Sequence, residues 1–334
     1  MKKVKTNIIY MGTPEFSVAP LLTLAKNKHF NISLVVTQPD RPKGRGKKLS
    51  LPLVKIAAQK AGLEVFQPEN INSQKSIEKI ESLNPDFFVV AAFGQILSQK
   101  ILDIPKIYPI NIHASLLPKY RGAAPIQAAI ANMDATTGVT TMIITQKLDS
   151  GDILMSASTP ISVDDTAKSL HDTLSLLGSD LIVKTINGVL NNSVKPIPQD
   201  HSKTSYVKRF KKSDGKINWN LSNRQICAHI NAMTPWPGAF TTLGNKRIKI
   251  YKAVPLDIDK SDIDKSSNRD LNYNQEHKPG VIFQCDKQGI HVATGSGSLC
   301  ILELMEASGK RLQAFQFLCG NKINTPAKFD LFHD

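Results

Sequence analysis

The sequence contains no run of about 18 consecutive apolar residues, the length that a membrane-spanning helix needs, so we expect no transmembrane segment. Only a short apolar stretch follows the basic N-terminus, with no small-residue cleavage site, which argues against a signal peptide. Cysteine is also scarce: only four are present, and none forms a CxxC pair or the cysteine–histidine spacing of a zinc site. We therefore expect a cytoplasmic protein that holds no metal.

A glycine-rich nucleotide loop is missing as well. The first apolar run, Thr6–Met11, predicts a buried strand, and Gly12–Glu15 predicts a turn into a helix that ends near Asn27. We expect Thr13 to cap that helix. The turn has one glycine in place of a Gly-x-Gly-x-x-Gly pattern, so no dinucleotide cofactor is expected.

Predicted strands and helices alternate through the first 190 residues. Short apolar runs predict further strands, and amphipathic runs predict the helices between them. The expected strands are Ile32–Thr37, Glu64–Phe66, Asp86–Ala92, Tyr108–His113, Gly138–Gln146 and Ile153–Ile161, and the expected helices are Val54–Ala61, Ser73–Leu83, Ala124–Ala131 and Asp165–Leu190. This order predicts an α/β fold with a Rossmann-like, doubly wound, mostly parallel sheet.

The rest of the chain predicts a smaller β domain. A proline-marked segment, Ser193–Asp200, predicts a linker, and a helix is expected near Arg224–Ala232. Short β-like runs with turn signals then predict an OB-like β-barrel: Phe240–Leu243, Lys246–Val254, Gly280–Gln284, Gly289–Thr294 and Cys300–Glu306. We expect a catalytic domain over residues 1–190, a linker over 191–207 and a barrel over 208–330, with a polar loop at Asp257–Lys278 inside the barrel.

Positive charge exceeds negative charge, giving a net charge of +14 at pH 7. Two basic runs stand out. One is the loop Gln38–Ser50, with Arg41, Lys43, Arg45, Lys47 and Lys48, and the other is Lys208–Lys216, with Lys208, Arg209, Lys211 and Lys212. Such a balance suggests a polyanionic partner such as RNA, although each run can equally be a solvated face.

The chain is organised around Ile110–Pro125. Apolar and other residues alternate from Tyr108 to His113, so Asn111 and His113 share one face of a strand. An asparagine amide can donate to a developing oxyanion, and an imidazole can carry a proton near neutral pH, so this pair suits acyl transfer. The same pattern also occurs as a satisfied polar pair at a sheet edge.

A carboxylate suited to this histidine lies in the turn after the strand Gly138–Gln146. Asp149 can orient and charge-stabilise His113, or it can be an ordinary Asx-turn residue, and spacing alone does not separate it from Asp152. The loop Phe93–Leu97 leaves the carboxyl end of the strand Asp86–Ala92. In open α/β sheets ligands bind at such ends, so this loop and Asn111 are expected to border one crevice.

Three segments together carry a family resemblance: Asn111–Gln127, Gln38–Leu49 and Leu148–Asp152. With them, essentially the whole chain resembles the methionyl-tRNA formyltransferase family of folate-dependent formyltransferases. The resemblance implies a catalytic triad of Asn111, His113 and Asp149, which chooses Asp149 over Asp152. It also implies a tetrahydrofolate-binding signature at Ser115, Leu116, Leu117 and Pro118, with the pterin along Phe93, Gln95, Ile96 and Leu97.

The implied reaction transfers the formyl group of 10-formyltetrahydrofolate to the α-amino group of methionyl initiator tRNA, giving N-formylmethionyl-tRNA for translation initiation. The two basic runs would then contact tRNA, and we expect a monomer that binds no membrane. The alternatives are a formyltransferase that acts on a nucleotide sugar or a purine precursor, a formylfolate hydrolase, and a non-catalytic RNA-binding protein.

Overall fold

A computed structural model describes residues 5–43, 48–256, 277–307 and 309–330. The chain forms two compact units. The first comprises residues 1–125, 136–160 and 170–208, and the second comprises residues 126–135, 161–169 and 209–334.

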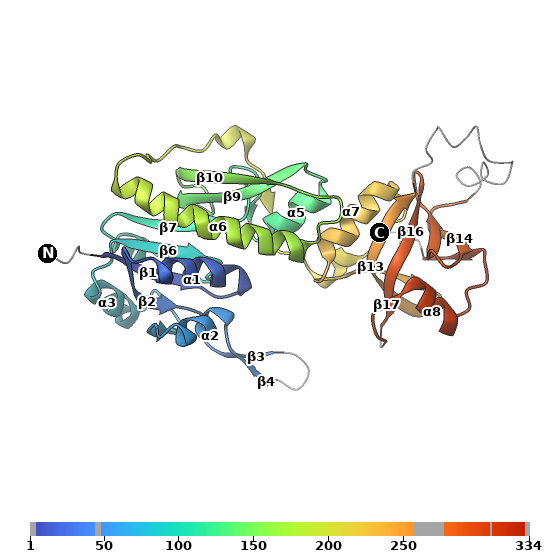
Figure 1. Cartoon of the computed structure of the whole chain (residues 1–334), viewed down its shortest axis with the longest axis horizontal. Coiled ribbons are helices and arrows are strands. Elements are labelled where there is room, and N and C mark those ends of the chain that lie inside the picture. The colour runs from blue at the N-terminus through green and yellow to red at the C-terminus, as the bar shows by residue number, and fades with distance from the viewer. Residues whose placement is uncertain (1–4, 44–47, 257–276, 308, 331–334) are drawn as a thin grey trace. The chain divides into compact units, whose positions relative to one another are not determined.

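The first unit contains a seven-stranded sheet, seen with its helices in Figure 1. The strand order is β10-β9-β7-β6-β1-β2-β5, and every neighbouring pair from β7 to β5 is parallel. At one edge, β9 is antiparallel to β7, and β10 is antiparallel to β9. The strands are β1 Thr6–Gly12, β2 Phe30–Val36, β5 Val65–Phe66, β6 Phe87–Ala91, β7 Tyr108–His113, β9 Thr136–Ile143 and β10 Ile153–Pro160.

Helices and short ribbons complete this unit. The helices are η1 Glu15–Ser17, α1 Val18–Lys26, α2 Leu53–Lys60, α3 Gln74–Ser82, α4 Gln99–Leu102, α6 Ala167–Leu190 and η2 His201–Lys203. One ribbon pairs β3 Arg41–Lys43 with β4 Lys48–Ser50, and another pairs β8 Arg121–Gly122 with β11 Tyr206–Val207. The expected doubly wound, mostly parallel sheet is therefore confirmed.

Side chains from both faces of the sheet are buried. On one face Ile9, Met11 and Phe88 join a core with Ile77 of α3 and Ile101 of α4. The neighbouring residues of the same strands point to the opposite face, because side chains alternate along a strand. On that second face α6 approaches the sheet so closely that a Cβ at Gly178 would lie 3.0 Å from Ile112.

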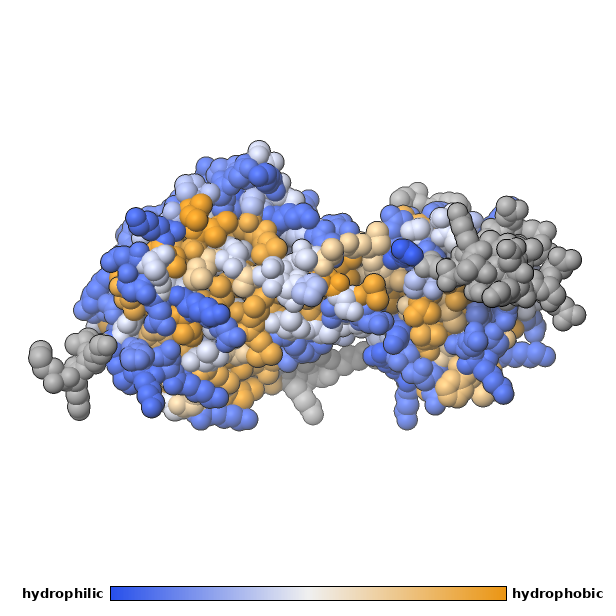
Figure 2. Space-filling view, turned by 45° about the horizontal axis from the view of Figure 1, so that its top comes forward, coloured by the Kyte–Doolittle hydropathy of each residue, from blue (hydrophilic) through white to orange (hydrophobic). Residues whose placement is uncertain are grey.

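Helix α6 is long and apolar enough to cross a membrane by length and composition, and half of its apolar window is buried in the protein. Core helices of folded domains pass the same test. Its Ser175 hydroxyl donates to the Phe16 carbonyl at 2.8 Å, and its Thr185 hydroxyl lies 2.8 Å from that of Thr141 in β9. These contacts bind α6 to the sheet. Figure 2 shows one face of the molecule, on which hydrophobic residues are interspersed with hydrophilic ones.

The second unit is built on a curled antiparallel sheet with the order β12-β13-β16-β15-β14-β18, to which β17 adds beside β16. Its elements are α5 Pro125–Ala131, η3 Lys212–Gly215, α7 Asn223–Met233, β12 Ala239–Leu243, β13 Lys246–Leu256, β14 Val281–Cys285, β15 Ile290–Ala293, β16 Ser298–Glu306, β17 Leu312–Gln313, α8 Ala314–Gly320 and β18 Ala327–Lys328. The Asp330 N–H, just after β18, donates to the Thr242 carbonyl of β12 at 3.1 Å. This bond draws the two edges together, as expected for a small barrel.

Some local expectations were wrong. The basic segment Gln38–Ser50 is not a plain loop, since its ends pair as β3 and β4, and residues 44–47 lie outside the described part of the chain. Thr13 does not cap the first helix, because its hydroxyl donates to the Phe93 carbonyl at 2.7 Å and Pro14 is the N-cap of η1. The expected polar loop Asp257–Lys278 falls almost entirely on residues that are not described.

Candidate active site

The candidate site begins at the carboxyl end of β7. Asn111 and His113 point to the same face of the sheet as Val90, because Asn111 pairs with Val90 in the neighbouring parallel strand. The intervening Ile112 is 3% exposed and packs against α6. Alternation of buried apolar and polar side chains thus sets the direction of both candidate catalytic groups.

The imidazole of His113 is held by two oxygen atoms. Its Nε2 lies 3.0 Å from the carbonyl oxygen of Tyr120, and its Nδ1 lies 3.7 Å from Oδ2 of Asp149. A carbonyl oxygen accepts only, so Nε2 carries a proton in this contact. His113 is 6% exposed, so these two oxygens hold the ring in a largely buried position.

Asp149 owes its place to an unusual turn. Its backbone has φ +48°, in the left-handed region that aspartate tolerates better than most residues. The Gly122 N–H donates to Asp149 Oδ2 at 2.8 Å, the same oxygen that faces His113. Gly122 itself must be glycine, since a Cβ there would lie 2.3 Å from the Val207 carbonyl oxygen. The structure thus pairs Asp149 with the histidine.

The Asn111 side chain is partly exposed. Among the residues that the structure describes, its amide makes no hydrogen bond, in contrast to the fully engaged His113 and Asp149. An amide donor that the protein leaves unpaired at the end of a strand is available to an oxygen of a substrate.

Half of the eight residues expected to bind folate are buried. Phe93, Leu97 and Leu117 are 2%, 7% and 7% exposed, and the Ser115 hydroxyl donates to the Lys119 carbonyl at 2.6 Å. Leu116 and Pro118 are partly exposed. Gln95 is also engaged, because its amide oxygen accepts from the Ile71 N–H and its nitrogen donates to the Pro68 carbonyl.

Ile96 differs from these residues, since it is 86% exposed. A ligand at this loop would therefore meet the Ile96 side chain and backbone groups, with the buried residues holding the loop in shape. The loop is also fastened to the segments that follow β1 and β2, because the Phe93 carbonyl accepts from the Thr13 hydroxyl and from Gln38 Nε2 at 3.3 Å.

The basic residues occupy two surface segments. Arg41 is exposed and pairs with the equally exposed Glu69 at 3.3 Å. Arg45 and Lys47 lie outside the described residues, and the side chains of Lys43 and Lys48 are not described. In the second segment all four residues are exposed, namely Lys208, Arg209, Lys211 and Lys212.

The base of the β3–β4 ribbon is anchored by ionic contacts. Lys55 Nζ lies 2.5 Å from Asp40 Oδ2, and Gln67 donates to Asp40 Oδ1 at 2.8 Å. The Lys55 hydrogen bond, helped by Gln67, holds the pKa of Asp40 below its usual value. The ribbon thus leaves the sheet from a fixed point, although the Arg41 side chain is exposed.

Two residues near the site were missed from the sequence. Arg121 is 2% exposed and donates to Gln199, which is itself 5% exposed and lies 78 positions later. Gln199 in turn donates to the carbonyls of Asp149 and Gly151. Arg121 lies within the segment Ile110–Pro125, around which the chain is organised. No local pattern links it to a glutamine so distant in sequence.

A cysteine, a histidine and a carboxylate also meet in the second unit. Cys300 Sγ lies 4.0 Å from His291 Nε2, and the same nitrogen lies 3.1 Å from Asp286 Oδ2. Burial, followed by the charge of Asp286, raises the pKa of Cys300 to about 11. The thiol stays protonated at neutral pH, so this group is not an activated nucleophile.

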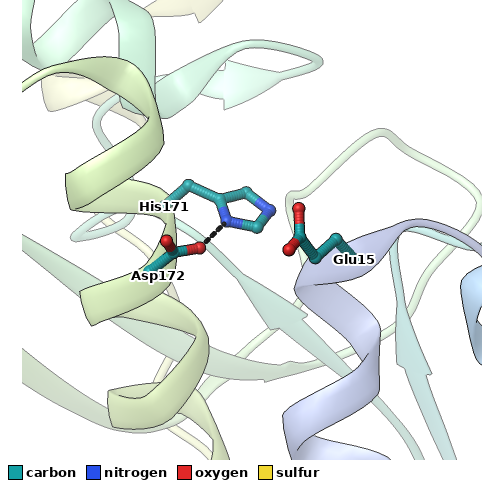
Figure 3. A group of neighbouring side chains, drawn as sticks. All are labelled: Glu15, His171 and Asp172. Atoms are coloured by element: carbon teal, nitrogen blue, oxygen red, sulfur yellow. Dashed lines mark hydrogen bonds and ion pairs between the residues drawn. The ribbon is translucent and has the colours of Figure 1, made fainter. Parts of the chain in front are cut away.

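The described residues contain one group with metal-ligand chemistry, shown in Figure 3: Glu15, His171 and Asp172. The side chains of His171 from α6 and Glu15 from η1 point toward one another. His171 Nδ1 lies 2.9 Å from Asp172 Oδ1, and the ring packs edge-on against Phe16. Glu15 and Asp172 are exposed, and the group contains none of the three candidate catalytic residues.

An amide donor and a histidine–carboxylate pair at the carboxyl end of a doubly wound sheet are groups that an acyl-transfer reaction can use. A family profile described as formyl transferase matches residues 4–186, and one described as formyl transferase, C-terminal domain, matches residues 209–322. The chain belongs to the formyl transferase family. The resemblance inferred from the sequence is thereby confirmed, as is the expectation of a transferase.

Individual relatives agree with this assignment. A methionyl-tRNA formyltransferase of Citrifermentans bemidjiense is 44% identical over 316 residues, which is 95% of this chain and 94% of that one. Another, of Ruminiclostridium cellulolyticum, is 41% identical over 321 residues, 96% of this chain and 98% of that one. A solved N-formyltransferase of Helicobacter canadensis, in complex with folinic acid and dTDP-3-aminofucose, has a TM-score of 0.63. It is 21% identical and covers 89% of this chain and 99% of its own, so it supports the fold alone.

Proposed function

We propose that this protein transfers the formyl group of 10-formyltetrahydrofolate to the α-amino group of methionine on initiator tRNA. The main support is the 3.7 Å contact between Asp149 and His113. His113 lies on β7, the strand that also presents the Asn111 amide. The names of the relatives add the acceptor, because proteins with 44% and 41% identity are methionyl-tRNA formyltransferases.

The reaction makes one C–N bond and breaks another. The neutral α-amino group attacks the formyl carbon, and the carbonyl oxygen becomes an oxyanion in the tetrahedral intermediate. This amine is partly neutral near pH 7–8, because an α-amino pKa is about 7.7–8. The bond to N10 then breaks, N10 takes up a proton, and the new amide loses the proton that the amine carried.

Each polar group has a role in these steps. The Asn111 amide would donate to the oxyanion as its negative charge develops. His113 would stabilise the same oxygen and manage the proton that N10 needs to leave. Asp149 would hold the imidazole and balance its positive charge across the 3.7 Å contact. No covalent intermediate is required, so the reaction needs no cysteine or serine nucleophile.

The formyl donor would lie beside the loop Phe93–Leu97. The buried Phe93 and Leu97 fix the loop, leaving Ile96 and backbone groups for contact with a flat pterin ring. The segment Ser115–Pro118 would support the loop that follows β7, since the Leu117 N–H donates to the Thr140 hydroxyl at 3.1 Å.

Binding of tRNA would depend on contacts between its phosphates and basic side chains. The basic residues of the Gln38–Ser50 segment would meet phosphates near the acceptor end, namely Arg41, Lys43, Arg45, Lys47 and Lys48. Lys208, Arg209, Lys211 and Lys212 would follow the backbone further along the RNA. We propose that the protein acts as a monomer.

The test is formylation of charged initiator tRNA by the purified protein, with uncharged initiator tRNA, charged elongator tRNA and an amino sugar nucleotide as controls. We expect formyl transfer to the charged initiator alone. Preferred transfer to the sugar nucleotide would favour the alternative acceptor, and release of formate without transfer would indicate a hydrolase. RNA binding with neither reaction would reduce the protein to a binding module.

A further inference from the structure

The segment from Ile197 to Val207 lies against both loops of the candidate site. Ile197 exchanges backbone hydrogen bonds with Ile153 of β10, at 2.8 and 2.9 Å. Further along, Ser205 and Val207 accept backbone N–H groups from Arg121 and Ala123 at 2.8 and 3.0 Å. All these residues belong to the first unit, whose last segment ends at Lys208.

Gln199 is the side chain through which this segment reaches the carboxylate loop. Its amide nitrogen donates to the Asp149 carbonyl at 2.9 Å and to the Gly151 carbonyl at 2.7 Å. These two bonds hold both sides of the turn in which Asp149 adopts its left-handed conformation. Because Gln199 is 5% exposed, water does not readily replace them.

Arg121 connects the same glutamine to the other loop. Its guanidinium donates to Gln199 Oε1 at 2.6 and 3.2 Å, and to Tyr206 Oη at 3.3 Å. Arg121 lies between Tyr120, whose carbonyl holds His113, and Gly122, whose N–H holds Asp149. The described residues place no carboxylate within salt-bridge distance of this guanidinium, so neutral acceptors fix its position.

We infer that Gln199 and Arg121 are positioning residues, which set the distance between His113 and Asp149 by tying the Tyr120–Gly122 loop to the Asp149 turn. The inference rests on the proposed function, because it deepens the account of the same site. Neither residue needs to touch a substrate. Their effect passes through the backbone groups that hold the imidazole and the carboxylate.

Gln199→Glu separates positioning from simple support of Arg121. The carboxylate keeps an acceptor for the guanidinium, but it loses both N–H donations and puts negative oxygens against two carbonyls. We expect kcat for formyl transfer to fall about 10- to 100-fold, as small misplacements of catalytic groups do. The Michaelis constants for donor and tRNA should stay within about twofold. Asp200→Asn, at the exposed neighbouring position, is the control and should keep the wild-type kcat.

A second readout does not depend on activity. In protein with ¹⁵N-labelled histidine, the ring signals of His113 should shift in Gln199→Glu and stay unchanged in Asp200→Asn, with similar melting temperatures. If Gln199→Glu is unstable, Arg121→Met tests the same connection from its other end. An active wild type with unchanged kcat and His113 signals in the variant would overturn the inference. A wild type that never formylates methionyl-tRNA, with the histidine signals still shifted, would overturn the proposed function instead.

Discussion

The end of β7 and the two basic segments differ in how the protein holds their side chains. His113 is buried and Asp149 is partly buried, and backbone groups of Tyr120 and Gly122 fix them from a neighbouring loop. Arg41 and Lys208, in contrast, are exposed, and Arg41 meets only an equally exposed glutamate. The first region therefore depends on exact geometry, and the second depends on charge.

This difference separates the kinetic effects expected in each region. Loss of a fixed group at β7 should lower the turnover number, because the transition state loses a contact that is already in place. Loss of a surface cation should weaken binding of a polyanion and its dependence on salt, with little effect on the chemical step. Variants at the end of β7 should therefore change kcat, and variants in the basic segments should change tRNA binding.

Asn111→Ala and His113→Ala should each lower kcat about 10²- to 10³-fold, which is the usual cost of losing a donor to an oxyanion. The partly exposed Asn111 is not part of the apolar core, so we expect its variant to remain folded. Formylation kinetics and a melting curve measure the two properties together. His171→Ala, at a half-buried histidine outside the site, should keep the wild-type rate. Full turnover by folded Asn111→Ala would remove this residue from the mechanism.

Asp149→Asn should lower kcat by roughly 10- to 100-fold and change the shape of the pH–rate profile. The amide keeps the size of the side chain but removes the negative charge that lies 3.7 Å from Nδ1 of His113. Binding of the formyl donor should be retained. Asp152→Asn removes the same charge three positions away and is the matched control. If both variants gave the wild-type profile, Asp149 would be a turn residue only.

Much of the fold could be predicted because its signals are local. The apolar run Asp86–Ala92 could only be a central strand, and it is β6, buried along its whole length. The five predicted barrel strands all exist: β12, β13 and β16 are one or two residues longer than predicted, β14 is shifted by one residue, and β15 is one residue shorter at each end. The strand β18 was missed, because its two residues are ordered by pairing with β14 and carry no pattern of their own.

The candidate site was less accessible to this reasoning. Period-two alternation places Asn111 and His113 on one face, which needs nothing beyond β7 itself. Asp149 faces His113 from a left-handed turn at φ +48°, which residue spacing does not encode. The prediction of Asp149 over Asp152 therefore came from the family resemblance. The bridge from Arg121 to Gln199 spans 78 positions, so only the folded chain reveals it.

Arg45→Ala should raise the Michaelis constant for tRNA about tenfold, which is the loss expected for one bidentate arginine contact. Its basis is the sequence, because Arg45 lies among residues 44–47, outside the described part of the chain. The Michaelis constant for the formyl donor should be nearly unchanged, since the donor is proposed to lie beside neutral groups near Ile96. Lys100→Ala, an exposed cation elsewhere in the first unit, is the control. A changed constant for the donor alone would contradict the assignment of this ribbon to RNA.

A double variant, Lys208→Ala with Lys212→Ala, should flatten the salt dependence of tRNA affinity. Each lost phosphate contact lowers the slope by about 0.7–0.9 log units per log unit of salt. Binding titrations between low and physiological salt measure this slope directly. Lys75→Ala with Lys100→Ala removes the same charge from exposed positions outside both basic segments, so it should leave the slope unchanged. Equal slopes in all proteins would mean that Lys208 and Lys212 belong to a solvated face.

The smallest effect is expected at the base of the ribbon. Asp40→Asn removes the ionic contact with Lys55 and should raise the Michaelis constant for tRNA about two- to threefold, in keeping with the modest strength of surface ion pairs. The pKa of Asp40 is lowered in the folded protein, so the contact persists above the ordinary carboxyl range and is lost only as the pH falls through that lowered value. The difference between variant and wild type should therefore stay constant from pH 6 to pH 9, as kinetic measurements at several pH values can show. Glu64→Gln breaks a similar pair with Lys79 and is the control. A larger loss in kcat than in tRNA binding would mean that this anchor serves the catalytic end of the sheet instead of the ribbon.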